Sequence, residues 1–313
     1  MRPALALIVL LLAPAALRAE NGRTAAATLT RALAARPESM AEAFAAVDGG
    51  VDSLGYNPAG LSGAERAEFQ SSYARGIARD NFGTLGYAHP LSWGTLAGGF
   101  AYYDGGDVLI NFSNGTQQTR TAQRDMAGLL SLSVPLSWGL CAGATGKLFR
   151  LELAEEARTT GYAADLGAIW RTPLRGLNLG AAVQNLGPDV KFEETADPLP
   201  TTLRFGAAYN LKLDNVGWLK EGGFGLSRIL FTADVVRIRE EKDYLPAAGL
   251  ELGIPIGEQG YGALRAGYLF SREINSLTVG MGLRQGRWLL DYGLGAIGQN
   301  LSNTHHFTFG AKF

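Results

Sequence analysis

Strand-like segments of this chain alternate large apolar residues with glycine, alanine or a polar residue. In the closing segment, Phe307, Phe309 and Phe313 fall on one face, and small or polar residues fall on the other. A period of two is the pattern of a β-strand with two different faces. The second face carries too few charges for the water-exposed side of a soluble sandwich and suits an enclosed lining. This alternation is typical of a transmembrane β-barrel.

The alternating segments number fourteen. They span 66–75, 80–90, 94–104, 123–134, 138–150, 160–171, 175–185, 200–211, 226–237, 245–254, 260–270, 275–284, 287–296 and 304–313. Bacterial barrels have an even number of strands, with short periplasmic turns and longer external loops. Most connections after even-numbered segments are short, with 212–225 as the exception, whereas 105–122, 151–159 and 186–199 are longer. The sequence predicts an all-β, antiparallel barrel of about 14 strands over residues 65–313.

Glycine is abundant, with 42 residues in the chain, and many of these lie inside the strand-like segments. Glycine weakens a strand unless a backbone or side chain must approach closely there. A narrow lumen that holds a plug has this requirement. We therefore expect part of the chain to fill the barrel.

The region before the first strand divides into two parts. Residues 1–19 resemble a signal peptide, since Arg2 precedes an apolar run and Ala19 ends a cleavage motif. Residues 20–64 form the N-terminal segment, in which Ser39–Val47 is predicted as a short helix because Ser39 and Glu42 fit a capping box. This segment either caps the barrel's mouth as a tail or enters the lumen as a hatch.

Composition excludes several functions. Removal of the signal peptide takes two arginines from the 28 basic residues and none of the 29 acidic ones, so the net charge is near −3 and no nucleic-acid partner is expected. The three histidines show no pattern of a catalytic triad, and His305 and His306 point to opposite faces of a strand. We expect a protein that is not an enzyme and has no metal site or cofactor.

Several runs resemble a known family in the right order. They are 43–61, which contains Tyr-Asn-Pro-Ala-Gly, then 184–187, 264–268 and 304–313. Together these resemble the PorV/PorQ family of FadL-like outer-membrane barrels. The resemblance implies fourteen strands and a hatch in the lumen. It marks as hatch residues Phe44, Asp48, Asp52, Tyr56, Asn57, Pro58, Ala59 and Gly60.

The resemblance implies two alternative functions in the outer membrane of a Gram-negative-type (diderm) bacterium. FadL-like members pass hydrophobic small molecules, and PorV-like members hold or shuttle exported proteins for a secretion system. Passage is slightly favoured, because the chain lacks long inserts for docking. A transporter of apolar molecules is also expected to have a lateral opening through a kinked strand. The expected partners are outer-membrane lipid and a hydrophobic ligand or a secreted protein.

Two further sets of residues are predicted to have roles. The terminal Phe313, with Phe307 and Phe309, resembles the signal recognised by barrel-assembly machinery, a further expected partner. Charges predicted to face the lumen are Asp165, Arg204, Arg265, Arg284 and Asp291. Buried charges need partners, and Asp48 and Asp52 of the hatch are candidates for the arginines. These charges either brace the hatch or hold it shut until a ligand arrives.

Overall fold

The protein is described by a computed structural model that covers most of the chain. The described residues are 24–76, 80–112, 115–192, 194–213, 225–241, 244–257, 260–270, 277–297 and 304–313. The predicted signal peptide and most of the connection at 212–225 lie outside these residues. In the described ranges, no helix is long and apolar enough to cross a membrane.

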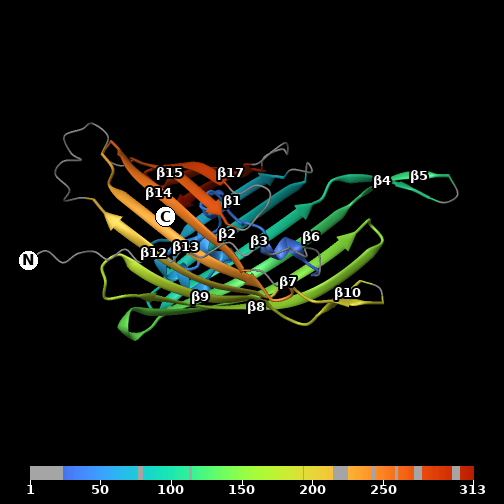
Figure 1. The fold of residues 1–313 in the computed structure, drawn as a ribbon, viewed down its shortest axis with the longest axis horizontal. Helices are drawn as coiled ribbons and strands as arrows, with labels where there is room; N and C mark the ends of the chain where they lie inside the picture. The colour runs from blue at the N-terminus through green and yellow to red at the C-terminus, as the bar shows by residue number, and fades with distance from the viewer. Residues whose placement is uncertain are drawn as a thin grey trace, which may run out of the picture.

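Fourteen strands in the described parts of the chain close into one antiparallel barrel (Figure 1). They are β1 (Glu68–Arg75), β2 (Asn81–Leu91), β3 (Gly94–Asp104), β6 (Gln123–Pro135), β7 (Leu140–Leu153), β8 (Ala157–Arg171), β9 (Leu177–Leu186), β12 (Thr202–Lys212), β13 (Arg228–Ile238), β14 (Tyr244–Ile256), β15 (Gly260–Leu269), β16 (Leu277–Gln285), β17 (Trp288–Ile297) and β18 (Thr304–Lys312). Pairing of β1 with β18, from Glu68↔Lys312 to Arg75↔His305, closes the barrel. Each predicted segment corresponds to one of these strands, so the predicted fold is confirmed.

Two predicted external loops differ from the structure. The region 105–122 contains a two-stranded hairpin of β4 (Asp107–Asn111) and β5 (Gln117–Thr121), which projects beyond the barrel in Figure 1. The loop predicted at 151–159 is mostly strand, because the ladder of β7 and β8 continues to the pair Leu153↔Ala157. Polar strand ends can stay paired outside the membrane, and apolar alternation alone does not report them.

The outer face of the barrel is apolar, with an aromatic belt at one rim. Large apolar side chains point outward along nearly every strand, including Phe205, Leu264, Leu290 and Phe309, each about half exposed. Tryptophans mark the rim with the short turns: Trp93, Trp138, Trp170 and Trp288. Such a surface suits lipid, with tryptophan at the membrane–water interface. The rim with the tryptophans is thus the periplasmic one.

Candidate functional site

Residues 24–64 thread through the lumen and form the hatch, drawn in blue inside the barrel in Figure 1. The hatch consists of four short helices joined by irregular backbone. They are η1 (Ala27–Thr30), α1 (Ala35–Glu38), η2 (Gly50–Gly55) and η3 (Pro58–Gly63). The side chains of Met40, Phe44, Tyr56 and Leu61 are fully buried. Of the two arrangements expected from the sequence, the structure therefore has the lumenal one.

Inward-facing glycines of the barrel make room for the hatch backbone. A Cβ on any of five of them would lie within 3.0 Å of a hatch main-chain atom, closer than real Cβ atoms come. These are Gly143, Gly180, Gly249, Gly267 and Gly293. The five belong to five different strands, so the hatch touches the wall around most of its circumference. For these five glycines the cause is the one that the sequence predicted.

The helix predicted at Ser39–Val47 is wrong. The helix lies earlier, at Ala35–Glu38, and the Ser39 hydroxyl donates to the Arg36 carbonyl, so Ser39 ends a helix instead of starting one. Ala41 and Glu42 have φ of 54° and 57°. Barrel side chains accept from the backbone that follows: Thr278 from the Ala41 N–H, and Asp234 from the N–H groups of residues 44 and 45. At residues 44 and 45 Asp234 replaces the carbonyls that a helix would use, whereas the Ala41 N–H also donates to the Glu38 carbonyl at 3.1 Å.

Asn57 of the predicted hatch motif fastens the hatch to two strands. Its Oδ1 accepts from the Ala59 N–H at 3.0 Å, which caps η3. Its Nδ2 lies 2.6 Å from the Ala45 carbonyl oxygen, 3.0 Å from that of Ala168 in β8 and 3.3 Å from that of Ala181 in β9. The amide nitrogen has two N–H donors for these three carbonyls, so one N–H is shared between two of them. One fully buried side chain thus links two parts of the hatch to the wall.

We expect Asn57→Leu to lower the free energy of unfolding by about 2–4 kcal/mol, because buried carbonyls would lose their donor. Urea unfolding in lipid vesicles, followed by fluorescence, measures this change. The exposed Asn111→Leu on β4 is the matched control and is expected to change stability by less than about 0.5 kcal/mol. Equal stability of the Asn57 variant and the wild type would contradict the role given to this amide.

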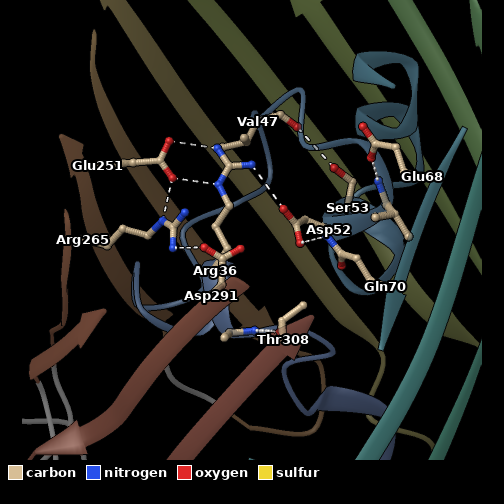
Figure 2. Close-up of polar contacts among 12 residues, drawn as sticks. Arg36, Val47, Asp52, Ser53, Glu68, Gln70, Glu251, Arg265, Asp291 and Thr308 are labelled. Atoms are coloured by element: carbon tan, nitrogen blue, oxygen red, sulfur yellow. Dashed lines mark hydrogen bonds and ion pairs between the residues drawn. The ribbon is translucent and has the colours of Figure 1, made fainter. Parts of the chain in front are cut away.

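A buried network of charges joins α1 and η2 to the barrel (Figure 2). Arg36 of the hatch donates through Nε to Glu251 of β14 at 2.8 Å and through Nη1 to Asp52 at 3.3 Å. Arg265 of β15 bridges Glu251 at 2.7 Å and Asp291 at 2.6 Å. Gln70 of β1 donates to the second oxygen of Asp52 at 3.0 Å. Arg36 therefore connects the hatch to both sides of the lumen.

Tyr56 lies beside this network and is also held by a cation. Its ring centroid is 5.7 Å from that of Phe44, and the Arg204 guanidinium lies 5.1 Å above the ring. Burial, together with the carboxylate of Glu42, raises the pKa of the Tyr56 phenol well above its ordinary value, so the phenol remains neutral. Arg204 also donates to Gln184 at 2.7 Å and pairs with Glu42.

The predicted lumenal charges all face inward. Arg204 and Arg265 contact hatch residues or their partners, and Asp291 binds Arg265. Asp165 pairs with Lys147 of β7 at 2.8 Å. Arg284 is half-buried and lines a small cavity together with Asp52 and Glu68.

The predicted partners of Asp48 and Asp52 are wrong in detail. Asp48 accepts from Arg171 at 2.9 and 3.0 Å and from Asn178 at 3.0 Å. Asp52 binds Arg36, an arginine of the hatch itself. The expected arginines lie on the strands β12, β15 and β16, whereas Arg171 lies at the periplasmic end of β8.

Several residues of the network were missed by sequence analysis. Glu251 sits between Leu250 and Leu252, so the alternation of β14 could have placed it on the lumenal face. Asp234 alternates with Ala233 and Val235 and had a weaker signal of the same kind. The pair of Glu38 with His306 had none, since Glu38 ends the short helix α1 and no strand alternation indicates where its side chain points. His306 is buried and His305 is exposed, which confirms their predicted opposite faces.

Above the charge network, towards the external loops, the lumen is filled by an outer apolar cluster. Barrel residues form one side of it: Phe82, Tyr103, Phe149 and Leu151. The other side comes from the start of the hatch, with Leu29 and Leu33, and from the short hairpin of β10 (Val190–Lys191) and β11 (Ala196–Asp197) with its flanks. The Ala25 N–H donates to the Pro198 carbonyl at 2.9 Å and joins the two segments.

The barrel wall next to this cluster contains a β-bulge. Pairing of β8 with β9 shifts register between Ala164 and Leu166, and Asn185 opposite has φ of 58°. Buried polar groups hold the bulge: Asp165 accepts from the Asn185 N–H at 2.8 Å, and Lys147 donates to Asn185 Oδ1 at 2.7 Å. Bulges locally disrupt a ladder and often occur beside functional sites.

The remaining predicted site is the closing strand. Phe307, Phe309 and Phe313 point outward and are 50%, 48% and 64% exposed. Their predicted recognition by barrel-assembly machinery stays a prediction.

Comparisons with known proteins identify the fold. No family model matches the chain, and no curated protein matches it, so the PorV/PorQ resemblance is not confirmed. Solved structures do match. The P. putida toluene transporter TodX gives a TM-score of 0.59 at 10% identity and covers 91% of this chain and 99% of its own. The CymD monoaromatic hydrocarbon channel gives a TM-score of 0.58 at 11% identity, with 90% and 97% covered.

At such identities the similarity concerns the fold, which these channels share over nearly their whole length. The prediction that the chain is not an enzyme stays a prediction. The lipid-facing exterior and the closed sheet place the chain in the outer membrane of a diderm bacterium. The chain is an outer-membrane β-barrel with the fold of hydrocarbon channels.

Proposed function

We propose that the protein passes hydrophobic small molecules across the outer membrane. The observation that carries the proposal is the outer apolar cluster, which lies between the external loops and the charge network of the hatch. The side of the cluster opposite the barrel wall comes from two short segments with little secondary structure, the start of the hatch and the β10–β11 hairpin. An apolar molecule that enters from outside can displace these segments from the barrel wall and make similar apolar contacts itself, because burial of apolar surface is non-directional.

The charge network and the bulge support a lateral route from this cluster. Arg36, Glu251 and Arg265 are buried below it, and a polar seal of this kind disfavours apolar solutes. The bulge at Asn185 lies beside the cluster, and the nearby Gly187 packs against Leu199 of the cluster. Because a bulge bends its strand, this bulge is a candidate for the kink expected of a transporter that opens laterally. Exit between β8 and β9 would deliver the molecule to the membrane without breaking the network.

TodX and CymD are described as a toluene transporter and a monoaromatic hydrocarbon channel, which supports the same class of substrate here. The second function expected from the sequence, an accessory of protein secretion, has no support from these similarities.

Uptake of a labelled monoaromatic hydrocarbon by cells of a diderm host tests the proposal. Cells that produce the barrel are expected to take it up several-fold faster than cells without it, whereas a labelled sugar enters both at one rate. Equal hydrocarbon uptake would contradict passage of this class of molecule.

Leu151→Gln tests whether the outer apolar cluster is on the route. Leu151 is 2% exposed within the cluster, and an added amide there would lower the affinity for an apolar solute by about tenfold. The same uptake assay, at equal barrel abundance in the membrane, measures the effect. Leu109→Gln, on the exposed β4 hairpin, is the matched control. Uptake that is equally fast in the wild type and both variants would place the route elsewhere.

A further inference from the structure

The lipid-facing wall of the barrel is hollowed across four neighbouring strands, β3, β6, β7 and β8, which are shown in teal to yellow-green in Figure 1. Two adjoining hollows have volumes of about 570 and 600 Å³. Both are lined by Gly128, Leu148 and Tyr162, so they form one continuous depression, here called the wall groove. The lining is mostly apolar.

Two glycines create the wall groove. Gly128 of β6 lies in register between Phe100 of β3 and Leu148 of β7, and Gly146 of β7 lies between Leu130 and Ala164. A Cβ on either glycine would meet nothing within 4 Å.

These glycines differ in this respect from the glycines that seat the hatch, whose Cβ would strike main chain. No contact inside the protein requires Gly128 or Gly146, although glycine weakens a strand. A molecule bound on the outer surface, in the space beside Gly128 and Gly146, would explain why glycine stands at both positions.

One cation stands at the external end of the wall groove. Arg150 lines one hollow, faces outward one step above Leu148, and lies in register with Met126 and Thr160. No acidic side chain within the described ranges forms an ion pair with it. From Leu140 to Arg150 the strand rises about 26 Å, given its rise per residue and the usual tilt, which matches the apolar height of an outer-membrane barrel. The guanidinium therefore lies at the level of outer-leaflet headgroups.

We propose that the wall groove binds a phosphorylated lipid of the outer leaflet, with an acyl chain along Gly128 and Gly146 and a phosphate on Arg150. We infer a lipid as the bound molecule because this face of the barrel is in contact with lipid and not with water. Arginine pairs with phosphate through a planar fork of donors, which adds specificity to charge. The inference is independent of the proposed function, since the site lies on the outer wall and needs no passage through the lumen.

Native mass spectrometry of delipidated, folded barrel in detergent tests the site. The probes are lipid A, the same lipid A with its phosphates removed, and palmitate. The wild type is expected to bind one lipid A at least about tenfold more tightly than the dephosphorylated form. Arg150→Gln is expected to abolish this difference, and Gly146→Leu, which fills the groove, is expected to weaken both lipids about tenfold.

Matched controls lie elsewhere on the outer face. Gly83→Leu adds the same side chain to an outward glycine of β2 that also has nothing within 4 Å, and Arg237→Gln removes an exposed cation on β13. Both are expected to bind lipid A as the wild type does. Equal affinity for the two lipids in the wild type, or unchanged binding in Gly146→Leu, would overturn the proposal. So would palmitate that displaces lipid A, since the groove would then serve a fatty acid.

Discussion

Replacing Arg36 with methionine is expected to lower the free energy of unfolding by about 3–5 kcal/mol and to raise the conductance of the barrel in planar bilayers. Arg36 is the hatch residue that holds Glu251 of the wall and Asp52 of the hatch together, and all three side chains are buried. Its loss leaves two carboxylates with fewer partners in a site from which water is largely excluded. Entry of water beside the hatch solvates these carboxylates at the lowest cost in free energy, and this water opens a path for ions.

Two further variants separate the network's effect from a general loss of packing. Arg237→Met removes a cation from the outer face and is expected to leave conductance unchanged. The double variant Arg36→Met with Glu251→Gln removes one of the stranded charges, so the two effects are expected to be less than additive. If Arg36→Met lowers stability without raising conductance, the charges only brace the hatch and do not hold it shut.

The barrel could be predicted from sequence because each strand carries its own evidence. Leu290 and Tyr292 face lipid while Asp291 and Gly293 face the lumen. The alternation of these residues in the sequence indicates the two faces without any tertiary information. Lipid and lumen are two distinct environments on the two sides of one sheet. A strand that crosses the membrane therefore alternates, and a period of two reports it.

The role of individual glycines could not be predicted in the same way. The alternation places Gly180 on the face of Asn178 and Gly128 on the face of Met126 and Leu130, but it does not say what lies opposite either glycine. In the structure Gly180 seats the Ala45 carbonyl of the hatch, whereas Gly128 opens onto the outer wall. The difference depends on which segment of the chain lies opposite, and this information is not local.

The path of the hatch was the least predictable part. Its backbone donors are satisfied by side chains about 190–240 positions later in the chain, such as Asp234 and Thr278, and local capping signals say nothing about such partners. Arg36 had no signal, because its neighbours Ala35 and Pro37 suggest neither burial nor a charge network. Sequence reasoning thus finds the hatch by its motif and misses the residue that connects it to the wall.

Gly180→Val is expected to keep the hatch from docking, so that the barrel folds with an open lumen. The Gly180 Cβ would overlap the Ala45 carbonyl group and the Cα of the next residue, which are main-chain atoms with no freedom to move aside. Overpacking of this kind typically costs about 1–3 kcal/mol and more where the backbone must shift. The outward ladder of β9 is untouched, because Gly180 faces the lumen and valine favours strands.

Single-channel conductance and protease cleavage of the hatch measure this outcome, with heat-modifiable migration on gels as the check that the barrel is folded. Gly83→Val is the matched control: the same change at a glycine with nothing within 4 Å is expected to leave conductance and cleavage as in the wild type. If Gly180→Val is folded, closed and resistant, the hatch seats without this contact, and the glycine-lined wall is not what positions it. If Gly180→Val is folded and open while Gly83→Val is folded and closed, the inward-facing glycines are needed for the hatch to dock in the lumen.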